Sequence, residues 1–283
     1  MCTSLKYRNC MGRNFDYEVS YNEELRVIDS MEFDNELKVI GMCTGFVKDY
    51  PLLYDGINEK GLCCSALAFT GNAKYFDEAD DKTNIPAFDF VFRILSSFNS
   101  VNDVKEFLQE NDVNIDNRQY SKEFPNSDLH WFVCDEDESM IIEQTEDGLS
   151  YYGGEVMTNN PPYPEQVSIC KKDLKKVGSD DLVLPEYNTR GTETYGLLGD
   201  YTSFARFSKL TFLRDKMEEY SEDKFDNVAQ TFHLLSSIEQ VYGLTPVGDK
   251  FEYTIYSVVY DMFNLKVYLR FYNELEYHIC EMF

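Results

Sequence analysis

Cys2 directly follows the initiator methionine, and Arg13 and Asp16 lie close behind it in the stretch GRNFD at residues 12–16. Methionine aminopeptidases remove Met1 when the second residue is as small as cysteine. We therefore expect Met1 to be removed, which leaves a thiol and a free α-amine on the same residue. An α-amine has a pKa of about 7.7–8.0, so it exchanges protons readily near neutral pH. This arrangement predicts a self-contained nucleophile, in which the thiol of Cys2 attacks and its own amine serves as the base.

The nearby charged pair supports that prediction. A guanidinium such as that of Arg13 favours the thiolate, which is the reactive form of cysteine. A carboxylate such as that of Asp16 can hold the α-amine by a hydrogen bond. The same two residues could equally form an ordinary salt bridge at the end of a strand, so the residue types alone leave both interpretations open.

Composition narrows the class of protein. The chain has 283 residues, with 26 Lys and Arg against 51 Asp and Glu, and a formal charge of -25. Such an acidic surface repels phosphate backbones, so we expect no nucleic acid partner. Residues 1–20 contain no apolar run of signal-peptide length, and no stretch approaches a membrane span, which predicts a cytoplasmic protein without a membrane partner.

The cysteines do not suggest a metal site. There are eight, and neither paired metal spacing nor a regular disulfide framework is apparent, so we expect most to be small buried residues; they stand at positions 2, 10, 43, 63, 64, 134, 170 and 280. We predict no metal and no cofactor. No repeat or long linker divides the chain, which predicts a single hydrolase domain over residues 1–283.

The surrounding elements alternate between strands and helices. Aromatic and β-branched residues predict strands over 129–135, 140–145, 149–159, 251–261, 265–273 and 37–46. The strands over 129–135, 140–145 and 149–159 are expected to form a meander. Apolar stripes predict four helices, over 84–98, 100–111, 205–219 and 225–238. Pro86 would stand in the first turn of the first helix, and Ser100 and Asp103 would form a capping box at the start of the second. This order predicts an α+β domain in which helices cover the outer faces of two stacked antiparallel sheets.

Taken together, an ordered set of motifs resembles the choloylglycine hydrolase family, which comprises bile salt hydrolases and penicillin V acylases and belongs to the N-terminal nucleophile hydrolases. The motifs are MCTSL, GRNFD, YDGINEKGL at 54–62, TNIPAFDFVFRIL, LHWFVCD with SMIIEQT, MTNNP at 157–161 and GDYTSFARF at 199–207. They follow the family's order over nearly the whole chain. The resemblance implies a four-layer αββα sandwich of antiparallel sheets.

The resemblance also implies roles for matching residues. Cys2 is the expected nucleophile, and Arg13 and Asp16 match the family's charged residues beside it. Asn159 matches an asparagine whose side-chain amide donates to the oxyanion, and Arg206 matches a second arginine near the site. Without the resemblance, Asn159 would be interpreted as a turn residue and Arg206 as a solvated cation at a helix start. The second oxyanion donor of the family, a backbone N–H, aligns with Ala68.

The chain departs from the family pattern in three places. Ala68 stands where bile salt hydrolases usually carry asparagine and penicillin V acylases usually carry tyrosine, so the side chain that separates the two activities is missing. The loop at 194–207 lacks two prolines that the family usually has. The chain ends at Phe283, soon after its last predicted strand, where family members commonly continue.

The resulting expectation is an amide hydrolase that cleaves a non-peptide C–N bond of an N-acylated small molecule, with conjugated bile salts as the first choice, through a Cys2 thioester. Penicillin V or another N-acyl amine or amino acid is the alternative substrate. A catalytically inactive binding protein on the same scaffold is a hypothesis of a different class. A conventional Cys–His hydrolase using His130, His233 or His278 is weaker. By resemblance we also expect a homo-oligomer, a tetramer.

Overall fold

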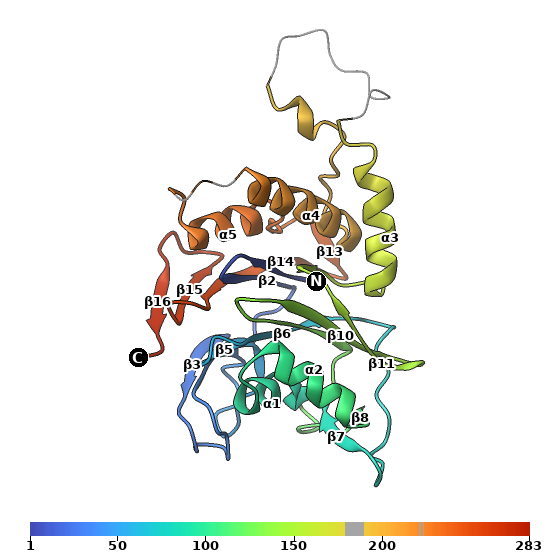
Figure 1. Cartoon of the computed structure of the whole chain (residues 1–283), viewed down its shortest axis with the longest axis vertical. Helices are drawn as coiled ribbons and strands as arrows, with labels where there is room; N and C mark the ends of the chain where they lie inside the picture. The colour runs from blue at the N-terminus through green and yellow to red at the C-terminus, as the bar shows by residue number, and fades with distance from the viewer. Residues whose placement is uncertain (179–189, 221, 223) are drawn as a thin grey trace.

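Two β-sheets are stacked face to face, and helices cover the outer face of each (Figure 1). The computed structural model describes residues 1–178, 190–220, 222 and 224–283. One helix pair, α1 and α2, packs on one sheet, while α3, α4 and α5 lie on the far side of the other. This is the four-layer αββα sandwich of antiparallel sheets that the sequence predicts.

The two sheets differ in how their strands follow the chain. In spatial order, the first sheet contains β12 (Val156–Met157), β1 (Cys2–Tyr7), β2 (Cys10–Tyr17), β14 (Lys250–Asp261), β15 (Lys266–Phe271) and β16 (His278–Glu281), with β13 (Thr245–Val247) beside β14. The second contains β11 (Gly148–Gly153), β10 (Ser139–Thr145), β9 (Leu129–Cys134), β6 (Cys63–Ala68), β5 (Leu53–Asn58), β4 (Val39–Cys43) and β3 (Glu24–Ile28). The first sheet thus joins both ends of the chain, and its N-terminal strand β1 lies between β12 and β2.

The helices come mainly from two stretches of the chain. They are α1 (Phe90–Ser97), α2 (Val101–Glu110), α3 (Tyr163–Leu174), α4 (Ser203–Glu219) and α5 (Asn227–Ser236), with short 3₁₀ turns at Ala87–Asp89 and Thr192–Thr194. The predictions over 100–111, 205–219 and 225–238 are confirmed as α2, α4 and α5. Helix α3 was not predicted, because its apolar residues form only a weak stripe among lysines and acidic residues.

The starts of α1 and α2 compare differently with the sequence prediction. Ser100 caps α2 as predicted, since its side chain accepts the backbone N–H of Asp103 at 3.1 Å. The prediction over 84–98 was wrong at its beginning. Thr83–Pro86 forms strand β7, which pairs in parallel with β8 (Val113–Asp116), and α1 begins only at Phe90. Pro86 therefore ends a strand instead of standing in a first helical turn.

The strand predicted over 149–159 is a second correction. Residues up to Gly153 continue the meander as β11, but the chain then crosses to the other sheet, where β12 pairs with β1. A Cβ on Gly154 would lie 1.8 Å from the hydroxyl oxygen of Tyr163, so a larger residue at this crossing would have to displace the Tyr163 ring. The crossing carries the following residues, 157–160, toward the start of β1.

Three apolar clusters fill the space between the four layers. One lies between α1, α2 and the second sheet, and another lies between the first sheet and helices α3, α4 and α5. The third lies between the two sheets and includes Cys2, Met11, Phe15 and Tyr256. The candidate nucleophile therefore sits at the margin of the central core, where the surrounding atoms are held by packing on both sides.

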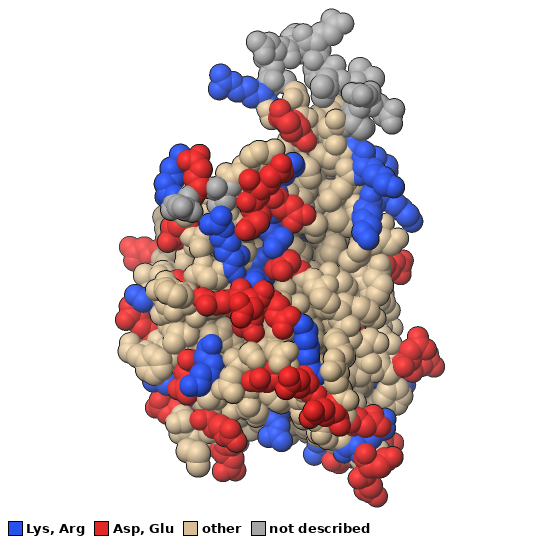
Figure 2. All heavy atoms as spheres, in the orientation of Figure 1, with Lys and Arg blue, Asp and Glu red and all other residues tan. Residues whose placement is uncertain are grey.

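The surface reflects the acidic composition. Figure 2 shows carboxylate side chains spread over most of the face in view, with basic side chains lying among them. Among the described residues, we find no helix with the length and apolar character needed to cross a membrane.

Candidate active site

The N-terminal hairpin brings the first predicted residues together. Cys2 pairs opposite Phe15, and Ser4 pairs opposite Arg13. Because side chains alternate across a strand, Cys2 and Arg13 point to the same face, toward the other sheet. Asp16 points to the opposite face, toward the helix layer, where it meets a side chain of α4. The hairpin thus places cationic and anionic groups on the two sides of the first residues of the chain.

The thiol of Cys2 lies against Arg13. Its Sγ is 3.8 Å from Nη2 of Arg13, and the Cys2 side chain is 5% exposed. The same guanidinium donates from Nη1 to Oδ2 of Asp55 at 2.7 Å and from Nη2 to the carbonyl oxygen of Ala66 at 2.7 Å. Burial alone lowers the pKa of Arg13, but the neighbouring negative groups, Asp55 among them, more than reverse this effect. Arg13 is therefore a fixed, protonated donor beside the sulfur.

The backbone nitrogen of Cys2 is held on its other side. It donates to Oδ1 of Asn159 at 2.9 Å. The N-terminal ammonium of Met1 donates to the carbonyl oxygen of Asp16 at 2.7 Å and to the carboxylate of Glu252. While Met1 is attached, the nitrogen of Cys2 is an amide and cannot accept a proton. Removal of Met1 converts this same, already positioned atom into an amine.

Asp16 is fully buried and depends on its partners. Thr254 donates from its hydroxyl to Oδ1 at 2.6 Å, and Gln240 donates from Nε2 to Oδ2 at 3.0 Å. Arg206 stands 3.8 Å from Oδ2. Burial raises the pKa of Asp16, while the charges of Arg206 and the N-terminus and the two hydrogen bonds counteract part of that rise.

Asn159 and Arg206 bind each other and the backbone of Cys2. Oδ1 of Asn159 accepts from Nη2 of Arg206 at 2.8 Å, and Nδ2 of Asn159 donates to the carbonyl oxygen of Ala68 at 2.8 Å. Arg206 also donates from Nη1 to the carbonyl oxygen of Cys2 at 2.9 Å. Burial lowers the pKa of this arginine, and the carboxylate of Asp16 opposes the change. Arg206 is fully buried, so the interpretation as a solvated cation was wrong.

The segment that carries Asn159 is held by side chains from the second sheet and from helices α3 and α4. The backbone N–H of Asn159 donates to Oγ of Ser203 at 2.9 Å. The carbonyl oxygen of Thr158 accepts from Nε2 of His130 at 2.8 Å, and its hydroxyl donates to Oε1 of Gln166 at 2.7 Å. These bonds hold the backbone from which the Asn159 side chain projects.

A cavity of about 570 Å³ opens beside the thiol. Cys2, Arg13, Asp16 and Ala68 reach it together with an aromatic and apolar lining; the other lining residues are Phe15, Tyr17, Tyr21, Leu53, Tyr54, Ala66, Thr70 and residues 123–129. Four of the six predicted site residues therefore line a concave surface that is large enough for a small amphipathic molecule, whereas Asn159 and Arg206 do not line it.

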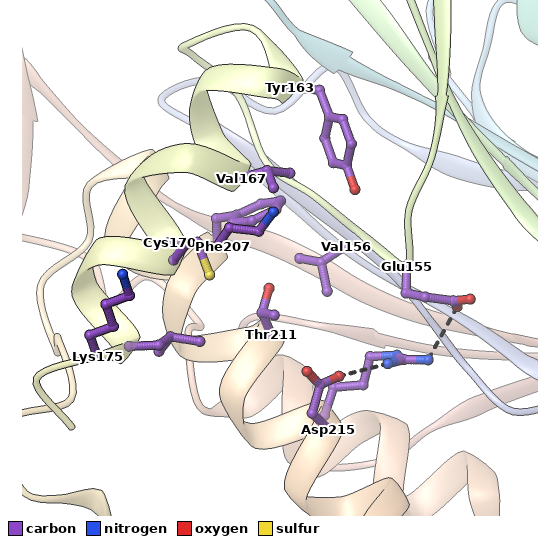
Figure 3. Close-up of a pocket in the computed structure, with 12 residues that line it drawn as sticks. Glu155, Val156, Tyr163, Val167, Cys170, Lys175, Phe207, Thr211 and Asp215 are labelled. Atoms are coloured by element: carbon purple, nitrogen blue, oxygen red, sulfur yellow. Dashed lines mark hydrogen bonds and ion pairs between the residues drawn. The ribbon is translucent and has the colours of Figure 1, made fainter. Parts of the chain in front are cut away.

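A second cavity of similar volume lies between α3 and α4 (Figure 3). Its wall includes Cys170, and Arg214 bridges Glu155 and Asp215 at its edge. Burial raises the pKa of Cys170, which disfavours the thiolate. The thiol in this cavity is thus poorly suited to nucleophilic attack.

A family model described as linear amide C–N hydrolases, choloylglycine hydrolase family, matches residues 2–283. The chain belongs to the choloylglycine hydrolase family. It is accordingly an N-terminal cysteine amide hydrolase, as predicted. The matched region begins at Cys2, the residue that becomes the N-terminus when Met1 is removed.

Relatives within the choloylglycine hydrolase family are similar over most of their length. A bile salt hydrolase/transferase of Lactiplantibacillus plantarum is 38% identical, with 96% of this chain and 90% of the relative covered. One of Clostridium perfringens is 34% identical, covering 91% and 85%. A solved variant of the conjugated bile acid hydrolase of C. perfringens superimposes with a TM-score of 0.89 at 30% identity, covering 99% and 92%. Penicillin V acylase from Agrobacterium tumefaciens shares the fold, with a TM-score of 0.75 at 18% identity over 99% and 86%.

The three histidines, all of which the structure describes, do not serve a Cys–His arrangement in this family member. His130 is buried and supports the carbonyl of Thr158. His233 is exposed on α5, and His278 is exposed on β16, where it pairs with Glu274. The base for Cys2 is therefore to be sought in its own amine.

Sequence reasoning missed four residues of this choloylglycine hydrolase site: Asp55, Gln240, Glu252 and Thr254. Asp55 stands inside the motif YDGINEKGL, so a buried carboxylate facing a predicted arginine could have been suspected. The other three lie more than 220 residues after Asp16 in the chain, and no local pattern connects them to it.

Proposed function

We propose that this enzyme hydrolyses the amide bond of conjugated bile salts, releasing the free bile acid and the amine. The observation that carries the proposal is the position of the Cys2 nitrogen, which is bound to Asn159 at 2.9 Å beside a cavity that the Cys2 thiol also reaches. The family relatives that are named bile salt hydrolases support the choice of substrate.

The first half of the reaction forms a thioester. After Met1 is removed, the α-amine takes the thiol proton, and the sulfur attacks the amide carbonyl carbon. Negative charge then develops on the carbonyl oxygen. The second N–H of Asn159 Nδ2 and the backbone N–H of Ala68 stabilise it, since the first N–H is already bound to the Ala68 carbonyl. The α-ammonium returns the proton to the departing nitrogen, the C–N bond breaks, and the amine leaves.

The second half regenerates the enzyme. The α-amine accepts a proton from water, and the resulting hydroxide attacks the thioester carbonyl. The C–S bond breaks, the thiol recovers its proton, and the carboxylic acid is released. Arg13 holds the sulfur in place during both halves, because its guanidinium is fixed by Asp55 and by the carbonyl of Ala66.

The cavity suits an apolar acyl group. Phe15 stacks on Tyr256 with ring centroids 5.1 Å apart, and Tyr54 lies against Phe15 at 4.9 Å. Of these rings, Phe15 and Tyr54 line the cavity, and with Leu53 and Leu129 they offer the apolar contacts that a steroid skeleton needs. Penicillin V and other N-acyl amines form the second substrate class, because the same aromatic wall can receive a phenoxy or alkyl group.

The test is amine release from glycine- and taurine-conjugated bile salts, penicillin V and N-acyl amino acids, with Cys2→Ala as the blank and intact mass to confirm loss of Met1. Cys2-dependent release from the bile salts supports the proposal. If amine is released from penicillin V alone, the alternative substrate class is the correct one. If none is cleaved but one binds, the inactive binding protein is the better description.

We also propose that the enzyme works in the cytoplasm as a homo-oligomer with a small-molecule partner and no nucleic acid or membrane partner. The exposed apolar side chains of Leu275, Tyr277 and Ile279 next to strand β16 at the sheet edge support assembly. Analytical ultracentrifugation tests this directly, and a tetramer is the expected species.

A further inference from the structure

Glu252 is a buried carboxylate that meets the N-terminus of the chain. Its side chain is 7% exposed, and it binds the ammonium of Met1. Consecutive backbone nitrogens lie about 3 to 3.6 Å apart, as standard bond lengths require. The nitrogen of Cys2 therefore lies within about 6 Å of the Glu252 carboxylate, given the direct contact with Met1. When Met1 is removed, the positive charge moves one residue along the chain and stays within reach of this carboxylate.

Glu252 is also joined to Asp16 by one side chain. Gln240 donates from Nε2 to Oε1 of Glu252 at 2.8 Å and to Oδ2 of Asp16 at 3.0 Å. Gln240 is fully buried, and its Oε1 accepts from the hydroxyl of Thr245 at 3.0 Å. The backbone N–H of Gln240 donates to the hydroxyl of Thr254 at 2.8 Å. Both hydrogens of the Gln240 amide are thus used to hold two carboxylates on the same side of the N-terminus.

We infer that Glu252 is a positioning residue that acts through the α-amine of mature Cys2, by its charge and by its bond to Gln240, and so sets the pH at which that amine becomes a base. The inference rests on the proposed function, in which the amine of Cys2 exchanges protons with the substrate. Glu252 does not line the cavity beside the thiol, so its effect reaches the reaction through the amine.

Charged groups surround the amine from every neighbouring element. Strand β2 contributes Asp16 and Arg13, helix α4 contributes Arg206, and strand β14 contributes Glu252. The charges of Asp16, Glu252 and Cys2 all act on Arg206, which places the four residues in one electrostatic cluster. Tyr17 on β2 is neutral, because burial raises the pKa of its phenol to about 12. Two anions thus favour the ammonium, and two cations oppose it.

The direction of the effect follows from these charges. Removing the negative charge of Glu252 leaves Asp16 alone against two guanidinium groups, so the ammonium becomes less stable and the pKa of the amine falls. The amine must be neutral to accept the thiol proton. The acid limb of kcat/KM therefore moves to lower pH in Glu252→Gln, by about one to two pH units for a charge about 6 Å away at an effective dielectric constant near 20.

The experiment compares pH profiles of mature wild type, Glu252→Gln and Glu252→Asp, each with loss of Met1 confirmed by intact mass. Glutamine can still accept the hydrogen bond from Gln240, so the fold is expected to persist. Glu252→Asp keeps the charge and should restore most of the wild-type profile. Asp261→Asn is the matched control, because Asp261 is a buried carboxylate at the other end of the same strand, where it binds Asn9 and Asn264.

A second measurement needs no substrate. In protein labelled with ¹⁵N-cysteine, the amine nitrogen of the mature N-terminus resonates far from all amide nitrogens, so its titration is read directly. A lower pKa of this amine in Glu252→Gln, with no change in Asp261→Asn, supports the inference even if no amide in the panel is cleaved. Failure to cleave any amide would count against the proposed function alone. An unshifted amine titration in Glu252→Gln overturns the inference. If Glu252→Gln fails to fold, the amine of Cys2 is titrated instead in folded Gln240→Leu, which frees Glu252 from Asp16. An amine titration identical to that of wild type then overturns the positioning role.

Discussion

Arg206 donates from Nη2 to Oδ1 of Asn159 at 2.8 Å, and this bond fixes the direction in which the Asn159 amide is turned. With the oxygen held by Arg206 and by the nitrogen of Cys2, the amide nitrogen must point toward Ala68. This is the orientation that the proposed oxyanion role of Asn159 requires. An arginine can in this way fix the side chain of the proposed oxyanion donor.

Replacing this arginine tests that control. Arg206→Lys keeps the positive charge near Asp16 but cannot reach Asn159 and the Cys2 carbonyl at once, because a lysine ammonium lacks the planar fork. We expect kcat/KM to fall by about 100-fold, as for loss of one oxyanion donor, with the fold preserved. Steady-state kinetics with circular dichroism provide the measurement. Wild-type turnover in this variant would show that Asn159 needs no such support.

The nucleophile is tested by two substitutions at one position. Cys2→Ala is expected to fold normally and to release no amine, because no group then forms the thioester. Cys2→Ser is expected to retain little activity, since a hydroxyl ionises far less readily than a thiol. Amine release and thermal unfolding of both variants after Met1 removal decide the matter. Undiminished turnover by Cys2→Ala contradicts the whole mechanism.

Asp55 is expected to matter for stability as well as activity. Its side chain is fully buried against Arg13, and Tyr256 donates from its hydroxyl to Oδ2 at 2.5 Å. Asp55→Asn leaves the Arg13 charge buried without its counter-ion, which costs about 3–5 kcal/mol in the free energy of unfolding. Urea denaturation measures the loss.

A surface pair supplies the comparison for that measurement. Lys48 contacts Glu24 at 2.6 Å, but its side chain is 66% exposed. Lys48→Ala should therefore cost less than about 1 kcal/mol. Equal losses in Asp55→Asn and Lys48→Ala would mean that burial adds nothing to the Arg13–Asp55 pair.

Cysteine labelling should separate Cys2 from the structural thiols. Burial raises the pKa of Cys10, Cys63 and Cys64, and raises that of Cys43 to about 11. These thiols are therefore protonated and inaccessible in the folded protein at pH 8. We expect iodoacetamide to modify Cys2, which lines a cavity, and the half-buried Cys280, and peptide mass mapping identifies the labelled sites. Early labelling of Cys63 or Cys64 would contradict the buried assignment.

The parts of this site that sequence reasoning reached are those encoded locally. Cys2, Arg13 and Asp16 fall on one hairpin, whose register follows from a short turn at residues 8–9. Asn159 and Arg206 were assigned by resemblance, and the structure places them together through bonds that no spacing encodes. Strand β7 and the crossing at Gly154 were mispredicted because pairing partners far along the chain decide them. Glu252 escaped notice for the same reason.

The burial of the first strand has a consequence for the order of events in biosynthesis. Thr3, Ser4 and Leu5 are fully buried, and β1 is paired on both sides, with β2 and with β12. An aminopeptidase must grip the terminal ammonium and the extended residues behind it, yet in the folded chain these are already bound by Glu252 and by neighbouring strands. We therefore expect Met1 to be removed before strand β1 is paired on both sides, while the nascent chain is still leaving the ribosome. On this expectation, molecules that fold first keep Met1, and the active fraction of a preparation depends on the relative rates of folding and trimming.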